Sequence, residues 1–211
     1  MTRRARRGPG RPPAAQTADT RDRIIRAARE TFSELGYDGT SFEDIAPRAG
    51  VTRTAVNHYF SSKRELYHIV VEQTNALVIQ SGVEKASSET TLLGQIGAFL
   101  EAATQADSED RSAAMFLITS VFESRRHVDL RETEHDAVTQ TREFLVGAVN
   151  AAIERGELVA ETNVSAVVSL LLATMWGMAF YAGFVGTHHE LETVVGQLRQ
   201  LLGGYLSPLS E

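Results

Sequence analysis

The sequence contains no cysteine among its 211 residues. Disulfide bonds, thiolate metal sites and cysteine nucleophiles are therefore excluded. Other catalytic signatures are missing as well, since there is no G-x-S-x-G motif, no P-loop and no dinucleotide-binding fingerprint. We therefore expect a protein that is not an enzyme and that uses no cofactor.

Charged residues are missing from one long segment, because residues 163–187 contain no Asp, Glu, Lys or Arg. The window Ala166–Val185 is long enough to cross about 30 Å of hydrocarbon, so a membrane-associated helical protein is one alternative. However, the window contains Ser169, Thr174 and Gly177, and its flanks are acidic with few basic anchors. We favour a helix buried between the core of one subunit and a partner subunit, without a membrane.

No alternating strand pattern, hairpin turn or internal repeat is found, and apolar residues recur at helical spacing. The fold class is therefore predicted to be all-α. The N-terminus is rich in Arg with no apolar stretch behind it, unlike a secretory signal, so the expected compartment is the cytoplasm. Beyond the fourth helix described below, helical segments are expected near 91–106, 110–126, 130–155, 163–186 and 190–206.

The net charge of −6 conceals a strong asymmetry along the chain. Residues 1–64 hold 13 of the 21 Lys and Arg residues but only 7 of the 27 Asp and Glu residues. The remaining residues, 65–211, therefore hold 8 basic and 20 acidic side chains. A basic end on an acidic body indicates that one end meets a polyanion, although uneven solvated charge would give the same count.

Residues 1–19 are rich in Arg, Pro, Ala and Gly and are expected to form a flexible basic arm. Within it, Gly10-Arg11-Pro12 resembles the core of the AT-hook, whose Arg enters narrow minor grooves. We favour the simpler interpretation, a basic tail that strengthens non-specific DNA binding.

Residues 20–66 are predicted to form a helix-turn-helix domain. The first helix ends at Gly36, the second begins at Ser41 with a capping box to Asp44, and the third is capped by Thr52. A second capping box, Ser62-Lys63-Arg64-Glu65, opens a fourth helix that runs into the low eighties. Gly50 supplies the sharp turn between the second and third helices, so that the third can enter a major groove about 12 Å wide.

The order of residues in this region resembles the N-terminal domain of the TetR (tetracycline repressor) family. The resemblance covers about residues 20–66 and is carried by Gly36-Tyr37, Thr40, Ile45-Ala46, Ala49-Gly50-Val51-Thr52, Tyr59-Phe60, Lys63 and Glu65-Leu66. It implies a DNA-binding repressor, a homodimer that leaves its operator when a small molecule binds. The rest of the chain, 67–211, would be the helical ligand-binding and dimerisation domain, similar to the family in length and helical character only.

The DNA-contacting residues follow from their chemistry and from this resemblance. Hydroxyls at the start of the second helix suit a phosphate, Arg53 suits guanine, and Asn57 can pair with adenine. The resemblance assigns a phosphate contact to Lys63. The full predicted set is Thr40, Ser41, Thr52, Arg53, Thr54, Asn57, His58, Tyr59 and Lys63. Thr54 and Asn57 depart from the family's small residue and Tyr, which is expected to alter the operator sequence rather than abolish DNA binding.

The last two predicted helices are the expected dimer-forming pair. The final helix carries an apolar stripe from Leu191 to Tyr205, and Ala173 and Gly177 would permit close approach of a partner. An intrachain hairpin is the alternative, but two half-sites on DNA favour a homodimer. Large apolar residues are expected to line a cavity for a bulky, partly apolar effector, namely Phe99, Met115, Phe116, Phe122, Phe144, Met175, Trp176 and Phe180.

Histidine and carboxylate pairs were considered as metal ligands. Glu123 and His127 are spaced i, i+4, His135 lies near Glu132, and His188-His189 is a tandem. We expect no metal, because no third ligand is evident and solvated helix ends explain the pattern. An effector-independent, DNA-organising helical protein remains the second alternative to a ligand-responsive repressor.

Overall fold

The structure, a computed structural model, describes residues 14–109, 111–130 and 136–206. Within these ranges the chain forms helices and turns without any strand, which confirms the all-α prediction. In chain order the elements are α1 (Ala14–Gly39), α2 (Phe42–Arg48), α3 (Arg53–Tyr59), α4 (Lys63–Asn75), η1 (Ala76–Gln80), α5 (Ser81–Ala86), α6 (Leu92–Glu109), α7 (Ser112–Arg126), η2 (Val128–Leu130), α8 (Ala137–Glu154), α9 (Val164–Phe180), η3 (Tyr181–Val185) and α10 (His188–Leu206).

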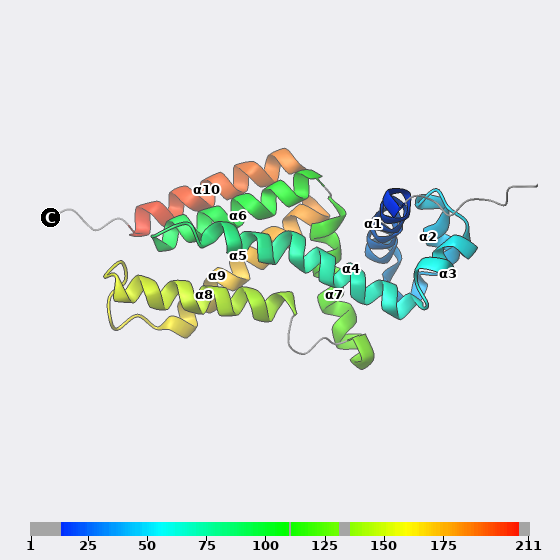
Figure 1. The fold of residues 1–211 in the computed structure, drawn as a ribbon. Helices are drawn as coiled ribbons and strands as arrows, with labels where there is room; N and C mark the ends of the chain where they lie inside the picture. The colour runs from blue at the N-terminus through cyan, green and yellow to red at the C-terminus, as the bar shows by residue number, and fades with distance from the viewer. Residues whose placement is uncertain (1–13, 110, 131–135, 207–211) are drawn as a thin grey trace, which may run out of the picture.

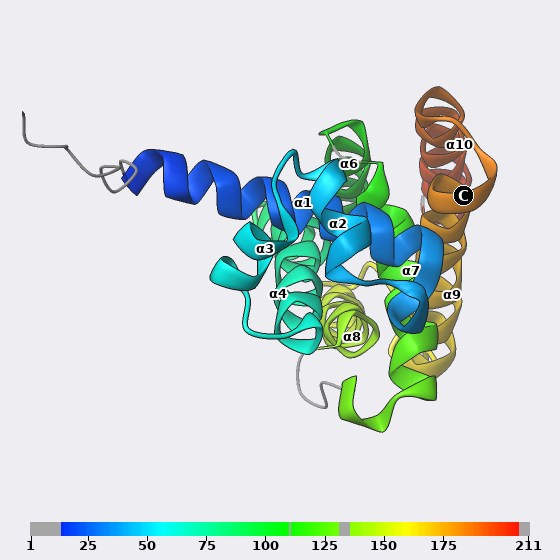
Figure 2. The same ribbon diagram turned by 90° about the vertical axis from the view of Figure 1, so that its right-hand side faces the viewer.

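Helices α1, α2 and α3 form a small domain at one end of the molecule (Figure 1), and the N-terminal part of α1 projects beyond it (Figure 2). Helix α1 begins at Ala14, so residues 14–19, expected within the arm, are helical. The Gly10-Arg11-Pro12 motif lies outside the described residues. Gly36 interrupts α1 with φ 70° and ψ 175°, a conformation that glycine alone adopts readily, so the predicted stop at this residue is confirmed.

The turn between α2 and α3 is built as the sequence predicts. Ser41 caps α2 through its hydroxyl, and the Asp44 carboxylate accepts the backbone N–H of Ser41 at 2.9 Å, which completes the capping box. Gly50 adopts φ 64° at the turn, and Thr52 caps α3 by accepting the N–H of Ala55 at 3.2 Å. The two short helices are therefore held rigidly at their starts and at the turn between them.

One nearly continuous helical path, α4–η1–α5, runs from Lys63 in the small domain to Ala86 in the body (Figure 1). Ser62 caps it by accepting the N–H of Glu65 at 3.1 Å. The predicted second capping box is only half formed, because the Glu65 carboxylate binds the hydroxyl and backbone N–H of Ser61 instead of the Ser62 N–H. Residues Ala76–Gln80 form a π-helical turn, a feature that often marks functional positions.

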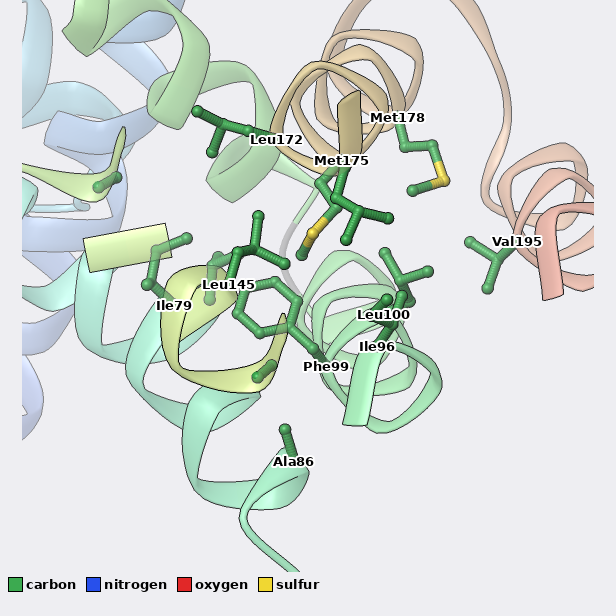
Figure 3. Close-up of a cluster of buried hydrophobic side chains, with 14 of the residues drawn as sticks. Ile79, Ala86, Ile96, Phe99, Leu100, Leu145, Leu172, Met175, Met178 and Val195 are labelled. Carbon is green, nitrogen blue, oxygen red and sulfur yellow. The ribbon is translucent and has the colours of Figure 1, made fainter. Parts of the chain in front are cut away.

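The larger body contains α5 to α10 around one apolar core, part of which Figure 3 shows. Its buried residues include Phe99 from α6, Leu145 from α8, and Leu172 and Met175 from α9. The helix expected over 130–155 begins at Ala137, where the Asp136 carboxylate accepts the N–H of Thr139 at 2.8 Å, and Val128–Leu130 forms a 3-10 turn instead.

The uncharged segment forms α9 and the π-helical turn η3. By length and composition, Val164–Val185 is a candidate for a membrane-spanning helix, and the search covered only the described residues. Only 28% of its most apolar window is buried within the chain. Large apolar side chains remain exposed along it, among them Leu170, Phe180 and Phe184. The chain by itself therefore does not provide the burial expected for this helix.

Candidate nucleic-acid interface and ligand cavity

Helix α3 presents a polar face to solvent and an apolar face to the small domain. Arg53, Thr54, Asn57 and His58 are exposed, whereas Val56 is fully buried. Positions 53, 54, 57 and 58 follow helical i, i+3 and i+4 spacing, so these side chains share one surface. The structure therefore brings together on one surface four of the five residues of this helix that the sequence assigns to DNA contacts; the fifth is Tyr59.

The edges of this face are braced by neighbouring side chains. Arg53 forms an ion pair with Glu43 of α2, with Nη1 2.5 Å from Oε1, and both side chains are mostly exposed. The half-buried Tyr59 ring packs edge-on against His58, with ring centroids 5.7 Å apart. Arg48 of α2 forms an ion pair with Glu34 of α1, which raises the pKa of the Arg48 guanidinium and lowers that of the Glu34 carboxyl.

Ser41 lies exposed at the N-terminus of α2, as a phosphate contact requires, but its hydroxyl also donates to Asp44 at 2.6 Å. This hydrogen bond, together with the one from the Ser41 backbone N–H, lowers the pKa of the Asp44 carboxyl. Thr40 is placed differently, because its side chain is only 2% exposed. Its hydroxyl donates to the carbonyl of Gly36 at 2.7 Å, so it closes a turn and does not face solvent.

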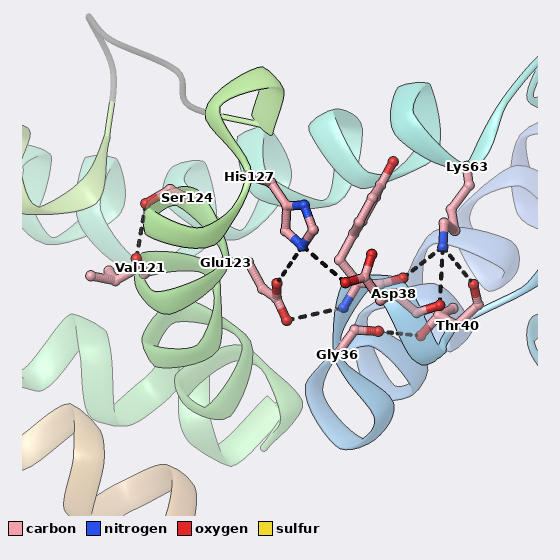
Figure 4. A network of polar contacts seen from close by, with 9 residues as sticks. Gly36, Asp38, Thr40, Lys63, Val121, Glu123, Ser124 and His127 are labelled. Atoms are coloured by element: carbon pink, nitrogen blue, oxygen red, sulfur yellow. Dashed lines mark hydrogen bonds and ion pairs between the residues drawn. The ribbon is translucent and has the colours of Figure 1, made fainter.

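Lys63 also points inward, toward the turn that follows α1 (Figure 4). Its Nζ donates to the carbonyl oxygens of Tyr37 at 2.7 Å and of Thr40 at 2.9 Å, and lies 3.5 Å from that of Asp38. The ammonium group also sits 4.4 Å from the centre of the Tyr37 ring, within cation–π range. In this structure Lys63 therefore braces the turn between α1 and α2, and its phosphate contact stays a prediction.

Helix α7 of the body is joined to the same turn by a polar contact. The buried Glu123 carboxylate accepts the backbone N–H of Tyr37 at 3.1 Å, and His127 Nε2 lies 3.4 Å from Glu123 and 3.3 Å from Asp38 (Figure 4). The sequence suggested Glu123 and His127 only as a possible pair of metal ligands. No group of three or more His, Cys, Asp or Glu residues suited to a metal occurs in the described part of the chain; Glu132 and His135 lie outside it.

Aromatic side chains also join α7 of the body to the small domain. Phe116 of α7 packs against Phe32 of α1 and Tyr67 of α4, with centroids 6.5 and 5.6 Å apart. The core of the small domain therefore extends into the body rather than ending at α4. Phe116 accordingly packs in this junction and is not among the residues that line the apolar cavity of the body.

An apolar cavity lies within the body and encloses about 630 Å³ of empty space, counting the space at its mouth. The space open to the centre of a water molecule is only about 60 Å³, so the cavity is narrow in this conformation. Of the residues described here, none that lines it is charged. The lining comes from η1, α6, α7, α8, α9, η3 and α10, with Val78, Ile79, Phe99, Leu100, Ala113, Ala114, Leu117, Thr141, Met175, Trp176, Met178, Ala182, Leu191 and Val195 among its residues.

Three of the eight expected ligand residues, Phe99, Met175 and Trp176, line this cavity. The others do not. Phe144 lies behind Phe99 and stacks on it at 5.3 Å, and the Met115 backbone crosses η3 closely at Gly183. Phe122 and Phe180 are 61% and 49% exposed on the outside of their helices. The sequence did not reveal this, because periodicity shows which residues share a face of a helix but not what that face contacts.

Val78 and Ile79, which line the cavity from the π-helical turn between α4 and α5, were not predicted from the sequence. Their apolar character was visible, but the deviation from α-helical geometry was not. Small residues such as Ala113 and Ala114 were also missed, because a search for large side chains overlooks the positions where small ones leave room.

A helix-turn-helix domain, joined through α4 to a body with an internal cavity, defines a DNA-binding regulatory protein.

Comparisons with known proteins agree with this class. Residues 24–70 match the sequence profile of the tetR family of bacterial regulatory proteins. The chain is 27% identical over 174 residues to the HTH-type transcriptional repressor BepR of Brucella suis, covering 77% of this chain and 80% of BepR. It is 48% identical to the HTH-type transcriptional regulator RutR of Escherichia coli, but over only 50 residues, 24% of each chain.

Among solved structures, FadR of Bacillus subtilis in complex with stearoyl-CoA matches with a TM-score of 0.68 at 18% identity. This match covers 86% of this chain and 96% of FadR, and at such identity it shows a common fold. Residues 24–70 therefore resemble the corresponding domain of the tetR family of bacterial regulatory proteins, and over most of its length the chain is similar to transcriptional regulators that carry this domain.

Proposed function

We propose that this chain is a cytoplasmic, homodimeric repressor that leaves its operator when a bulky, partly apolar small molecule binds in the cavity. The observation that carries the proposal is a continuous helical path, α4–η1–α5, which begins at the DNA-binding domain and lines the cavity at Val78 and Ile79. One element thus connects the two sites, so displacement at the cavity can change the position of the DNA-binding domain.

The proposed DNA interface is the exposed face of α3 with the start of α2. Arg53 and Asn57 are assigned to base edges, because their side chains are exposed and suit guanine and adenine. Ser41, Thr52, Thr54, His58 and Tyr59 remain proposed contacts to phosphates or bases. The Thr40 side chain is left out, because its hydroxyl is buried in the turn.

The proposed dimer interface is the exposed face of α9 and α10. Leu170, Phe180, Phe184 and Leu201 are at least 46% exposed, and Phe180 stacks on Phe184 at 5.4 Å. Ala173 and Gly177 lie on the same face of α9, and nothing lies within 4 Å of where a Gly177 Cβ would be. Small residues between large apolar ones allow two helices to approach closely. This apolar face is therefore proposed to pack against the same face of a second copy of the chain instead of remaining exposed to water.

Ligand binding is proposed to act by widening the narrow cavity. Because only about 60 Å³ of the cavity is open to the centre of a water molecule, a bulky molecule is proposed to push the lining helices apart when it enters. Displacement of Val78 and Ile79 moves the α4 path, and with it the distance between the two α3 helices of a dimer. The ligand shifts the equilibrium only because it binds the widened, DNA-free conformation better.

The first test selects duplexes from a random library with the purified protein and measures affinity for the selected operator. Arg53→Ala and Asn57→Ala are expected to weaken discrimination between operator variants by about 1–3 kcal/mol. Arg26→Ala, an exposed arginine on α1, is the matched control and is expected to change discrimination little. If no duplex is selected at low salt, the DNA-binding proposal fails.

The second test screens apolar compounds by thermal shift and by release of the operator duplex. A stabilising compound that also releases DNA supports the repressor; DNA binding that no cavity ligand alters supports the effector-independent alternative. Sedimentation separates the remaining alternative, since a dimer in buffer supports the α9–α10 interface, whereas pelleting with lipid vesicles supports membrane association of Val164–Val185.

A further inference from the structure

A polar groove lies on the surface of the body between α6 and α10, and none of the functions above uses it. About 390 Å³ in the groove is open to the centre of a water molecule, several times the value for the apolar cavity. Its lining includes Glu101 and Thr104 from α6, His188, Glu192 and Arg199 from α10, and Lys85 from α5.

The groove adjoins the apolar cavity. Thr104 and Val195 line both spaces, and Val195 is almost buried between them. Figure 3 shows Val195 beside Leu100 and Met178, at the edge of the apolar cluster that faces α10. A molecule that crosses this boundary would have one apolar part in the cavity and one polar part in the groove.

Two cations in the groove, Lys85 and Arg199, share the carboxylate of Glu101, whereas the second carboxylate of the groove, that of Glu192, lies 3.6 Å from both His188 Nε2 and His189 Nδ1. Glu101 lies 2.5 Å from Arg199 Nη1 and 3.7 Å from Lys85 Nζ. A guanidinium and an ammonium group together offer eight N–H donors, far more than one carboxylate can accept. The Arg199 guanidinium also lies across Gly97 of α6, 3.2 Å from where a Cβ would be, so its position is set by a close contact. The pair can therefore hold a second, anionic group.

The groove faces away from the proposed dimer interface. On α10, residues 188, 192, 195 and 199 recur at helical spacing toward α6, whereas the exposed Val194, Gln197 and Leu201 lie about half a turn away. A partner on the Val194 and Leu201 side would leave the groove open to solvent. Ligand entry from this side is therefore compatible with the dimer.

We propose that the effector is a carboxylate-bearing amphiphile, whose apolar chain fills the cavity and whose carboxylate binds Arg199 and Lys85 in the groove. This inference rests on the proposed function for its biological meaning, but binding can be measured without DNA. Glu101 occupies the head-group position in the empty protein and moves aside when the ligand carboxylate arrives.

The test titrates the full-length protein with octanoate, octan-1-ol and octylamine, which share one chain length and differ in the head group. Trp176 lines the cavity and is the only tryptophan, so its fluorescence reports chain binding. Octanoate is expected to bind about tenfold more tightly than octan-1-ol, with octylamine weakest. Equal binding of octanoate and octan-1-ol, or an unchanged Trp176 signal, would overturn the proposal.

Variants at half-exposed positions then identify the head-group site. Arg199→Gln is expected to reduce octanoate affinity about tenfold and leave octan-1-ol unchanged, whereas Arg23→Gln, also half exposed but on α1, should change neither. Glu101→Gln is expected to raise octanoate affinity several-fold, because it removes the competing charge; a merely structural role would not produce a gain. If Arg199→Gln weakens both probes equally, the assigned head-group site is wrong.

The outcome also separates this inference from the proposed function. If octanoate binds as described but does not release the operator, the amphiphile site stands and ligand-controlled repression by it fails. If another compound releases the operator while octanoate fails to bind, repression stands and the amphiphile site is overturned.

Discussion

The Glu123 carboxylate of α7 accepts the backbone N–H of Tyr37 at 3.1 Å, although 86 positions separate the two residues. One turn of α7 thereby touches the DNA-binding domain, while Ala113, Ala114 and Leu117 of the same helix line the cavity. Movement of α7 is thus a second path, besides α4, by which the cavity can affect α1 and α2.

Replacing Glu123 by Ala is expected to weaken this junction. The substitution leaves the partly buried N–H of Tyr37 without its acceptor, which costs about 1–3 kcal/mol of unfolding free energy. Urea denaturation followed by circular dichroism measures the loss, and Glu72→Ala, at an exposed position on α4, is the matched control. Equal stability of the two variants would show that the Glu123 contact contributes nothing.

Gly36 is expected to be intolerant of any side chain. Its φ of 70° with ψ of 175° is a region that other residues avoid, and an added Cβ would lie 2.8 Å from Glu123 Oε1. Gly36→Ala should therefore destabilise the protein by about 1–3 kcal/mol. Gly39→Ala, three residues later, meets only an ordinary contact at 3.5 Å and serves as control in thermal unfolding. A Gly36→Ala melting temperature no lower than that of Gly39→Ala would refute this explanation.

The sequence predicted the DNA-binding domain well because its signals are local. Ser41, Thr52 and Ser62 cap helices within three residues of themselves, and the positive φ values at Gly36 and Gly50 are visible as glycines at expected stops. The direction of Lys63 was not predictable, because its carbonyl partners lie 23–26 positions earlier in the chain. Of the eight residues predicted to line the cavity, three do so. The others could not be distinguished from them, because burial and access to the cavity depend on long-range packing that one sequence does not reveal.

Two roles of Lys63, bracing the turn between α1 and α2 or contacting a DNA phosphate, can be distinguished by one substitution. As a brace, Lys63→Gln removes the hydrogen bonds to Tyr37 and Thr40 and is expected to lower the unfolding free energy by about 1–3 kcal/mol. Arg26→Gln, which removes the same charge from an exposed site on α1, should change stability by less than about 0.5 kcal/mol. An unchanged stability together with a salt slope of DNA binding reduced by about one would instead assign Lys63 to a phosphate.

Glu157 is expected to make stability depend on pH. Burial alone would raise its pKa, but the Leu92 N–H at 2.7 Å and the Arg155 guanidinium outweigh that effect and hold the pKa below 4.5. A lowered pKa in the folded state contributes stability above pH 4.5, which is lost as the pH falls through the lowered value. Glu157→Gln should therefore cost about 1–2 kcal/mol at pH 7 and progressively less below pH 4. A difference that is constant between pH 7 and pH 3.5 would contradict the assigned role.

Gly82 of α5 sets the position of Phe99 at the cavity. A Cβ on Gly82 would lie 2.8 Å from two atoms of the Phe99 ring. Phe144 stacks on the Phe99 ring with centroids 5.3 Å apart and so limits how far that ring can move. Gly82→Ala is therefore expected to push Phe99 toward the cavity or α5 away from α6, at a cost of about 1–3 kcal/mol.

Because α5 continues the helical path from the DNA-binding domain, this variant should also change operator affinity without touching any DNA contact. Gly147→Ala is the matched control, since it adds a methyl group to an exposed position of α8 with nothing within 4 Å and should stabilise the helix by about 0.5–1 kcal/mol. Operator titration and urea denaturation of both variants test the coupling. If Gly82→Ala loses stability but binds the operator with wild-type affinity, the cavity wall at Phe99 does not communicate with α4, and control of DNA binding must pass through the Glu123 junction of α7.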